Sequence, residues 1–136
     1  MGDDIRKAER ILANYRSELP EPDPDWPDEV QRVIECIHEH LYRPNLKVCW
    51  LKEQCYINGT HFTTLFKYYT GMGLKKYIQY HRLKVAKQVL SEDSLKDITI
   101  LQVALALGYS GKGAFIHAFK KLQNDPPGKW RTKQFA

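Results

Sequence analysis

The chain has 136 residues, of which 43% are hydrophobic and 27% are charged, with a formal net charge of +5. This length is enough for one modest domain or two very small ones, and the composition is ordinary for a protein that folds in water. No apolar run approaches the roughly 18 residues of a membrane span, and the start MGDDIRKAER is unlike a signal or transit peptide. We therefore expect a cytoplasmic protein without a membrane partner.

Charge is distributed unevenly along the chain. Residues 1–45 hold six Lys or Arg and eleven Asp or Glu, net −5, whereas residues 46–136 hold fifteen and five, net +10. A basic region of this kind favours a polyanion, most commonly nucleic acid, although it also occurs on merely soluble surfaces and on proteins that meet anionic membranes.

The residues of common catalytic and metal sites are not arranged for that chemistry. Cys36, Cys49 and Cys55 are an odd number without CxxC spacing, so we expect buried free thiols. Cys36, His38 and His40 alternate, which scatters them around a helix and predicts no metal site. The sequence has no Gly-rich phosphate loop, nucleophile elbow or HExxH motif. We expect neither an enzyme nor a cofactor.

The acidic third of the chain predicts two helices and a linker. Residues 3–19 are amphipathic, with a stripe formed by Ile5, Ala8, Leu12, Tyr15 and Leu19. Four prolines in residues 19–29 forbid a continuous helix and predict an extended linker. A second helix then has Pro27 near its first turn and stops at Pro44. Its predicted buried face is Val30, Val33, Ile34, Ile37 and Leu41.

A first helix-turn-helix pattern follows. Residues 46–56 predict a short helix whose inward side chains are Val48, Leu51 and Cys55. After a break, Asn58 is a suitable N-cap for the helix THFTTLFKYY, which glycines at 71 and 73 end. The inner stripe of this second helix is Phe62, Leu65, Phe66 and Tyr69.

A longer helix, from Leu74 to about Leu90, separates this pattern from a similar one. There, Thr99 and Gln102 form a capping box that opens ILQVALAL, and Gly108 ends that helix. Ser110 caps the next helix, which runs to about residue 123 and has the apolar stripe Phe115, Ala118, Phe119 and Leu122. No segment alternates long enough to predict a strand. We expect an all-α fold with two helix-turn-helix subdomains joined by a long linker helix, preceded by an N-terminal helix and a Pro-rich spacer.

From about Leu46 to Arg131 the sequence resembles the DNA-binding domain of the AraC/XylS family of bacterial transcription regulators. The matching motifs are IxxVAxxxGYS at 100–110, Phe115, AFKK at 118–121, PPGKWR at 126–131, LFKYYTG at 65–71, Tyr77, Arg82 and Val89-Leu90. The resemblance implies two helix-turn-helix units on a linker helix and double-stranded DNA as the partner. Four positions depart from the family pattern, namely Lys47, Lys52, Tyr56 and Asn124. Tyr56 and Asn124 both stand where the family usually has Gly.

A recognition helix needs one face to bury and another to place in the major groove, which admits a helix. Periodicity puts Thr60, Thr63, Thr64 and Lys67 outward in the first unit, beside His61, and Gly113, Ile116, His117 and Lys120 outward in the second, after Lys112. The resemblance implies base contacts from most of these positions. The predicted base-contacting residues are Thr60, His61, Thr63, Thr64, Lys112, Gly113, Ile116 and His117.

Helix N-termini and exposed lysines are the predicted phosphate contacts. They are Asn58, Lys67, Lys75, Lys76, Ser110, Lys120, Lys121, Lys129 and Arg131. Trp130 is expected to be a packing residue and not a base-stacking platform, and Arg82 is expected to serve as a structural ion-pair partner.

The expected domains are 1–28, an amphipathic helix with an acidic Pro-rich linker, and 29–136, the DNA-binding domain. The latter divides into 29–73, the linker helix 74–91, and 92–136. Residues 1–45 could dimerise, through residues 1–28, or dock on the DNA-binding domain, or be the tail of a longer protein whose sensor domain is missing from this chain. By resemblance alone we expect an activator, associated with the nucleoid, that could contact RNA polymerase.

Two other classes remain open from the sequence. The chain could be a small helical protein-interaction module whose N-terminal helix grips a partner and whose basic surface is incidental. RNA binding is a weaker alternative, because no sheet platform or GXXG loop is predicted.

Overall fold

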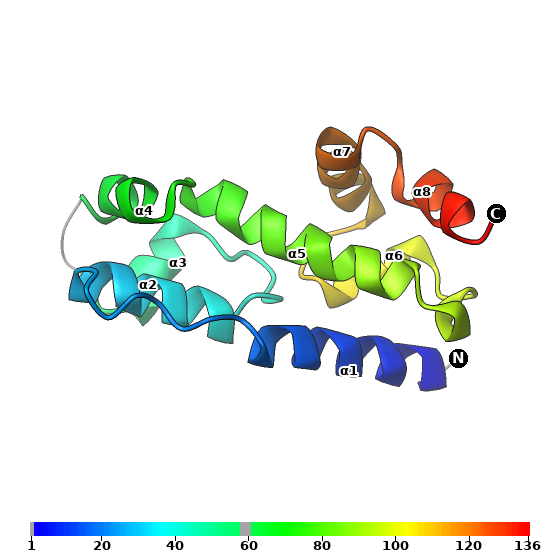
Figure 1. Cartoon of the computed structure of the whole chain (residues 1–136), viewed down its shortest axis with the longest axis horizontal. Helices are drawn as coiled ribbons and strands as arrows, with labels where there is room; N and C mark the ends of the chain where they lie inside the picture. The colour runs from blue at the N-terminus through cyan, green and yellow to red at the C-terminus, as the bar shows by residue number, and fades with distance from the viewer. Residues whose placement is uncertain (1, 58–60) are drawn as a thin grey trace.

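The computed structural model describes residues 2–57 and 61–136, and within these ranges the regular structure is entirely helical. Figure 1 shows the arrangement. The elements are α1 (Gly2–Ser17), α2 (Asp28–Glu39), α3 (Val48–Gln54), α4 (Phe62–Thr70), α5 (Leu74–Leu90), the 3-10 helix η1 (Asp93–Leu95), α6 (Ile100–Ala106), α7 (Lys112–Gln123) and α8 (Pro127–Gln134). The expected all-α class, with its N-terminal helix, is confirmed.

The first subdomain consists of α2, α3 and α4, with α2 in contact with both of the others. Its apolar residues meet as the periodicity predicts, because Val33, Ile37, Leu51 and Phe66 are all fully buried. Gly71 ends α4 with a φ of 81°, a left-handed conformation that glycine adopts without steric cost. The predicted helix start at Asn58 lies outside the described residues, and α4 has His61 at its N-cap.

The second subdomain consists of η1, α6, α7 and α8. The predicted capping box is present: Gln102 N–H donates to Thr99 Oγ1 at 3.0 Å, and Thr99 N–H donates to Gln102 Oε1 at 2.9 Å. The prediction that Ser110 caps α7 is wrong, because the N-cap is Gly111, without a side-chain hydrogen bond. Asn124 ends α7 with a φ of 66°, so it takes the left-handed role expected for it.

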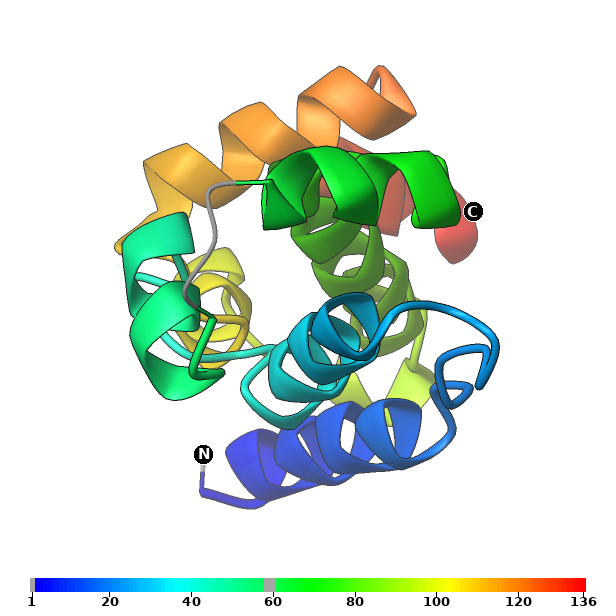
Figure 2. The same ribbon diagram turned by 90° about the vertical axis from the view of Figure 1, so that its left-hand side faces the viewer.

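Helix α1 lies on one side of α5 and α7 on the other in both views, and Figure 2 shows α4 on the same side as α7 (Figures 1 and 2). It packs against α5, η1 and α6 and buries Ala8, Leu12 and Tyr15. Of the three options open for this segment, the structure shows docking on the rest of the chain. Ala8, Leu12 and Tyr15 of the apolar face that a dimer through residues 1–28 would use are covered within the chain itself, whereas Ile5 is 38% exposed.

Several boundaries differ from the expectations. Helix α2 ends at Glu39, well before Pro44, and α8 was not predicted at all. The Pro-rich spacer is not a free linker, because the Trp26 ring lies 6.2 Å from the ring of Tyr69 in α4. Gln31 Nε2 also donates to the Trp26 carbonyl oxygen at 2.7 Å. These contacts hold the spacer against the first subdomain.

Three predicted burial sites are wrong. Val48 and Leu122 are 41% and 43% exposed, although both were placed on inward stripes. Cys49 is an exposed thiol, whereas Cys55 is buried and Cys36 is half-buried; all three are free. None of the helices in the described ranges combines the length and the apolar character that crossing a membrane would require.

Candidate nucleic-acid interface

The two predicted recognition helices, α4 and α7, line one concave groove. This α4–α7 groove has a volume of about 1330 Å³, and the first turns of α5 form its floor. Its lining includes Thr63 of α4 and His117 of α7, so the two sequence-predicted reading faces open into the same space. Figure 2 shows α4 and α7 together, with α1 on the opposite side of α5.

Helix α4 presents the face that the sequence predicts. Phe62 and Phe66 are buried, which turns Thr63, Thr64 and Lys67 toward the groove. Thr64 and Lys67 are exposed and Thr63 is half-exposed. Sequence reasoning missed Tyr68, which also lines the groove and is 79% exposed. An aromatic residue on the solvent side of a short helix was the available signal.

Helix α7 presents a face shifted by one residue from the predicted one. The groove is lined by Ala114, His117, Ala118, Lys121 and Leu122. Of the predicted base-contacting residues, only His117 belongs to this set. Lys112 and Gly113 are exposed and Ile116 is half-buried, and all three lie on α7 outside the groove lining.

The electrostatics of the groove suit a polyanion. Four of its lining residues are lysines, Lys67, Lys75, Lys76 and Lys121, and no Asp or Glu occurs among the described residues that line it. These four are among the predicted phosphate contacts. Lysine side chains along a concave wall lower the free energy of a phosphate backbone placed there and make that attraction sensitive to salt.

The floor of the groove is held by a network that joins α5 to the second subdomain. Tyr109 Oη donates to Gln79 Oε1, and both residues line the groove. Burial raises the pKa of Tyr109 to about 12, against a smaller opposing effect of Arg82. Tyr109 therefore stays a neutral donor and keeps Gln79 in place.

Arg82 connects the two subdomains but is not the ion-pair partner that we expected. Its Nε donates to the Leu41 carbonyl oxygen and its Nη2 to the Arg43 carbonyl oxygen, each at 2.8 Å. The guanidinium lies 5.3 Å from the ring centroid of Tyr109. Burial lowers the pKa of Arg82. A charge bonded to two backbone carbonyls fixes the segment that follows α2 relative to the turn between α6 and α7.

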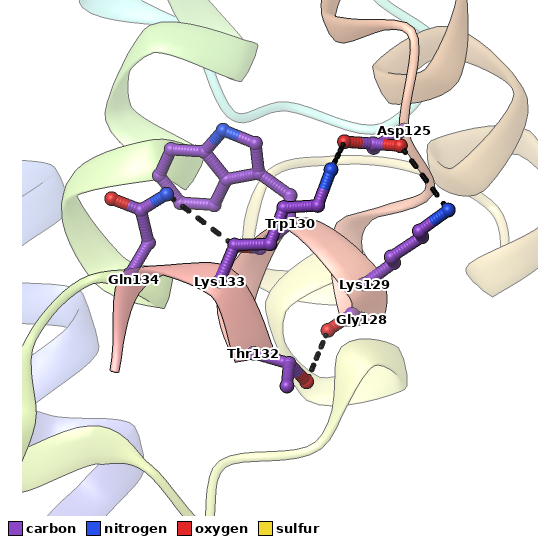
Figure 3. A network of polar contacts seen from close by, with 7 residues as sticks. All are labelled: Asp125, Gly128, Lys129, Trp130, Thr132, Lys133 and Gln134. Carbon is purple, nitrogen blue, oxygen red and sulfur yellow. Dashed lines mark hydrogen bonds and ion pairs between the residues drawn. The ribbon is translucent and has the colours of Figure 1, made fainter. Parts of the chain in front are cut away.

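Helix α8 buttresses α7 through Trp130, whose ring lies edge-on to Phe119 at 5.7 Å. Trp130 therefore packs as expected. Figure 3 shows Asp125, in the turn before α8, between two lysines of that helix. Lys133 Nζ lies 2.7 Å from Asp125 Oδ2 and Lys129 Nζ 3.8 Å from Oδ1. The hydrogen bond from Lys133 is the main cause of the lowered pKa of Asp125.

Other predicted phosphate contacts lie away from the groove. Lys129 is engaged with Asp125, and Arg131 donates to the Ile98 carbonyl oxygen, so a phosphate would compete with existing partners. Ser110 and Lys120 are exposed but do not line the groove, and the same holds for His61. The contacts predicted for Asn58 and Thr60 lie outside the described residues. Residues 2–57 and 61–136 contain no group of His, Cys, Asp or Glu arranged to hold a metal ion.

The arrangement of two helix-turn-helix units around a basic groove defines a DNA-binding class of fold, and comparison with known proteins agrees. The family model for a helix-turn-helix domain matches residues 53–133. The chain is similar to the probable transcription factor PqrA of Proteus vulgaris, with 30% identity over 103 residues, 75% of this chain and 82% of PqrA. It is also similar to the HTH-type transcriptional regulator AlkR of Acinetobacter baylyi, with 33% identity over 105 residues.

The alignment with AlkR covers 77% of this chain but only 33% of AlkR, so the chain spans about a third of the length of that relative. Among solved structures, the DNA-binding domain of AdpA in complex with a target DNA has the same fold. Its TM-score is 0.67 at 23% identity, covering 79% of this chain and 93% of that one.

The chain belongs to the AraC-type helix-turn-helix family of bacterial transcription regulators and is a DNA-binding domain of that family. This family is defined by DNA binding and not by catalysis.

Proposed function

We propose that the chain reads a specific sequence of double-stranded DNA with α4 and α7 in successive major-groove segments on one face of the duplex. The single observation that carries this proposal is the shared groove. Thr63 and Thr64 from one unit and His117 from the other line one lysine-rich concavity. Major-groove segments on one face of B-DNA recur every 34–36 Å, so one protein molecule would cover about two turns.

Each side chain has a role that its chemistry allows. Threonine hydroxyls can donate or accept, and their methyl groups can contact thymine. Lys112, exposed on the first turn of α7, can donate to guanine O6 or N7, and Ile116 can contact a thymine methyl. His61, His117 and the backbone at Gly113 complete the proposed contacts. Lys67, Lys75, Lys76 and Lys121 would bind phosphates and set the register without reading bases.

The remaining parts of this proposal extend to the whole regulator. We divide the chain into residues 1–28 and a DNA-binding domain of 29–136, with units 29–73 and 92–136 joined by the helix 74–91. We assign it an activating role at promoters in the cytoplasm, on the nucleoid, in contact with RNA polymerase. A separate sensor domain would supply the regulatory signal. The greater length of AlkR supports the separate sensor domain, and the other assignments rest on the family.

One structural observation disfavours the alternative of a protein-interaction module. That alternative needs the apolar face of α1 to grip a partner, but Ala8, Leu12 and Tyr15 are already buried against the rest of the chain. The basic groove, in contrast, faces solvent.

Selection of bound duplexes from a random pool tests the proposal. We expect two conserved half-sites about one helical turn apart. Replacing Thr63 and Thr64 by Ala should erase preference in one half-site, and His117→Ala should weaken it in the other. Equal, weak binding to every duplex would contradict sequence-specific reading and favour the interaction module.

A salt titration separates phosphate contacts from base contacts. The logarithm of the affinity should fall with the logarithm of the salt concentration by about 0.9 per neutralised phosphate, so Lys76→Ala should reduce that slope by about 1. Lys7→Ala is the matched control, because Lys7 is an exposed lysine on α1, across α5 from the groove. Its slope should equal that of the unmodified protein.

A further inference from the structure

Helix α1 lies outside residues 53–133, which the helix-turn-helix family model matches, yet it packs against α5, η1 and α6 within that region. Its 16 residues make a rod of about 24 Å, nearly as long as α5 with its 17 residues. The helix lies across α5 from α7 in both views, and Figure 2 shows α4 on the same side as α7 (Figures 1 and 2). It can therefore influence the groove without touching DNA.

One end of α1 is bonded to the first subdomain. Tyr42 lies in the segment that follows α2, and its hydroxyl donates to the Leu12 carbonyl oxygen at 2.8 Å. Arg16 Nη1 donates to the carbonyl oxygen of Glu39, the last residue of α2, at 2.9 Å. Both bonds end on backbone carbonyls, so they fix the backbone positions of α1 and α2 relative to each other.

The same helix is also bonded to the linker helix and packs against the second subdomain. Tyr15 Oη lies 2.7 Å from His81 Nδ1 of α5, within an aromatic cluster that also holds His38 and Tyr77. The His38 Nε2 to Tyr77 Oη distance is 2.6 Å, which ties α2 to α5 in the same cluster. Elsewhere along its length α1 contacts η1 and α6.

We propose that α1 is a positioning element that clasps the two helix-turn-helix subdomains at one orientation and so sets the half-site spacing of the DNA that the protein binds. This inference rests on the proposed function. A single linker helix can bend along its length. A second rod fixed to α2, α5 and α6 removes that freedom, because bending α5 would have to break its contacts as well.

Spacing is a sensitive measure of this rigidity. One added base pair moves a half-site by about 3.4 Å and rotates it by about 35° around the duplex axis. A rigid pair of recognition helices cannot follow that change, whereas a flexible pair can follow it in part.

The test compares two identical substitutions on the same helix. Ala8 is 2% exposed, whereas Ala13 lies on the exposed face of α1. In Ala8→Asp a carboxylate would have to be buried without a partner, so α1 should detach. In Ala13→Asp the carboxylate stays in water. Each full-length variant is titrated with duplexes in which the selected half-sites are moved together or apart by one and two base pairs.

We expect the unmodified protein and Ala13→Asp to lose affinity by about tenfold for a shift of one base pair, comparable to a base mismatch. Ala8→Asp should lose less than about threefold for the same shift. Its affinity for a duplex carrying one half-site should be unchanged, a result that general unfolding would not give. A spacing profile in Ala8→Asp identical to that of the unmodified protein, with α1 detached, would overturn the proposal.

Amide hydrogen exchange shows whether α1 has detached while α4 and α7 remain folded. If Ala8→Asp unfolds the whole chain, Leu12→Ala replaces it, since truncating that buried side chain loosens the helix without introducing a charge. The same two spacing outcomes then decide the question. Failure of the proposed function is distinguishable, because the unmodified protein would then show no sequence preference at any spacing.

Discussion

Gly108 and Tyr42 approach so closely that a side chain at Gly108 has no room. A Cβ placed there would lie 2.7 Å from the Tyr42 carbonyl oxygen and 2.8 Å from Arg82 Nη2. The φ of Gly108 is +97°, which disfavours any L-residue independently of the contact. The second helix-turn-helix turn thus presses on the chain that follows α2, at the point where Arg82 joins the two subdomains.

Gly108→Ala should therefore lower the free energy of unfolding by about 3 kcal/mol or more, since backbone strain and a clash with a backbone oxygen add. Urea titration followed by circular dichroism measures this. Gly113→Ala is the control: Gly113 lies in α7 with open space where a Cβ would be placed, so alanine should raise stability by up to about 1 kcal/mol. Equal effects of the two substitutions would show that the Gly108 contact is unimportant.

The corresponding turn of the first subdomain holds Tyr56, where the family usually has glycine. Tyr56 has a φ of 54° and a side chain that is 82% exposed, so the ring contributes little packing to offset the backbone strain. Tyr56→Gly should raise the free energy of unfolding by about 1 kcal/mol. Tyr56→Ala keeps the Cβ and should leave the urea midpoint nearly unchanged. A stabilising effect of both substitutions alike would point to the ring and not to the backbone.

Acid should loosen the protein at the cluster that holds α1. Burial, with smaller effects of His38 and Lys84, lowers the pKa of His81 from 6.5 to about 4. Above pH 6.5 neither state is protonated. Between pH 6.5 and 4 the unfolded chain binds a proton that the folded chain excludes. The free energy of unfolding therefore decreases as the pH is lowered through this range, and below pH 4 the decrease levels off. We expect a loss of about 1–2 kcal/mol, reduced because water reaches part of the ring.

Urea midpoints at pH 7.5, 6 and 5 check this prediction. In His81→Gln the titrating group is absent, so the fall across this range should be smaller than in the unmodified protein. Burial also lowers the pKa of His38, so His38 would account for the decrease in stability that remains in this variant. An unchanged pH profile in His81→Gln would assign the acid sensitivity elsewhere.

Lys112 and Lys121 should differ in what they do to DNA binding, although both are exposed lysines of α7. Lys112→Ala should reduce discrimination at one base pair by about 1–3 kcal/mol, because its proposed partner is a base edge. Lys121→Ala should weaken binding to all duplexes alike, since a phosphate carries no sequence information. Competition between duplexes that differ at single positions measures both. A uniform loss in Lys112→Ala would reassign that residue to the backbone.

Features that depend on neighbours in the sequence could be predicted from it. The capping box of Thr99 and Gln102, the left-handed stop at Gly71 and the tolerance of Asn124 for positive φ are all local properties, and the structure confirms them. The buried face of α2 followed from its periodicity for the same reason.

Features that depend on residues distant in the sequence could not be predicted from it. Helix α8 has weak amphipathicity and is held by Trp130 against Phe119 and by Asp125, so its own residues carry little helical signal. Val48 and Leu122 fit helical stripes but fall at the edge of the groove, where no second layer covers them. The groove face of α7 differs from the predicted one by a single residue, because packing on Phe115 and Phe119 sets the rotation of the helix.

The acidic spacer and α2 also give the molecule an electrical polarity. Residues 18–39 carry eight Asp or Glu and one Arg, and none of these residues lines the lysine-rich α4–α7 groove. In the field of a duplex such a dipole experiences a torque that turns the groove toward the phosphates before contact. Collisions are thereby pre-oriented, and the association rate in dilute salt should exceed that of a uniformly charged protein of equal net charge.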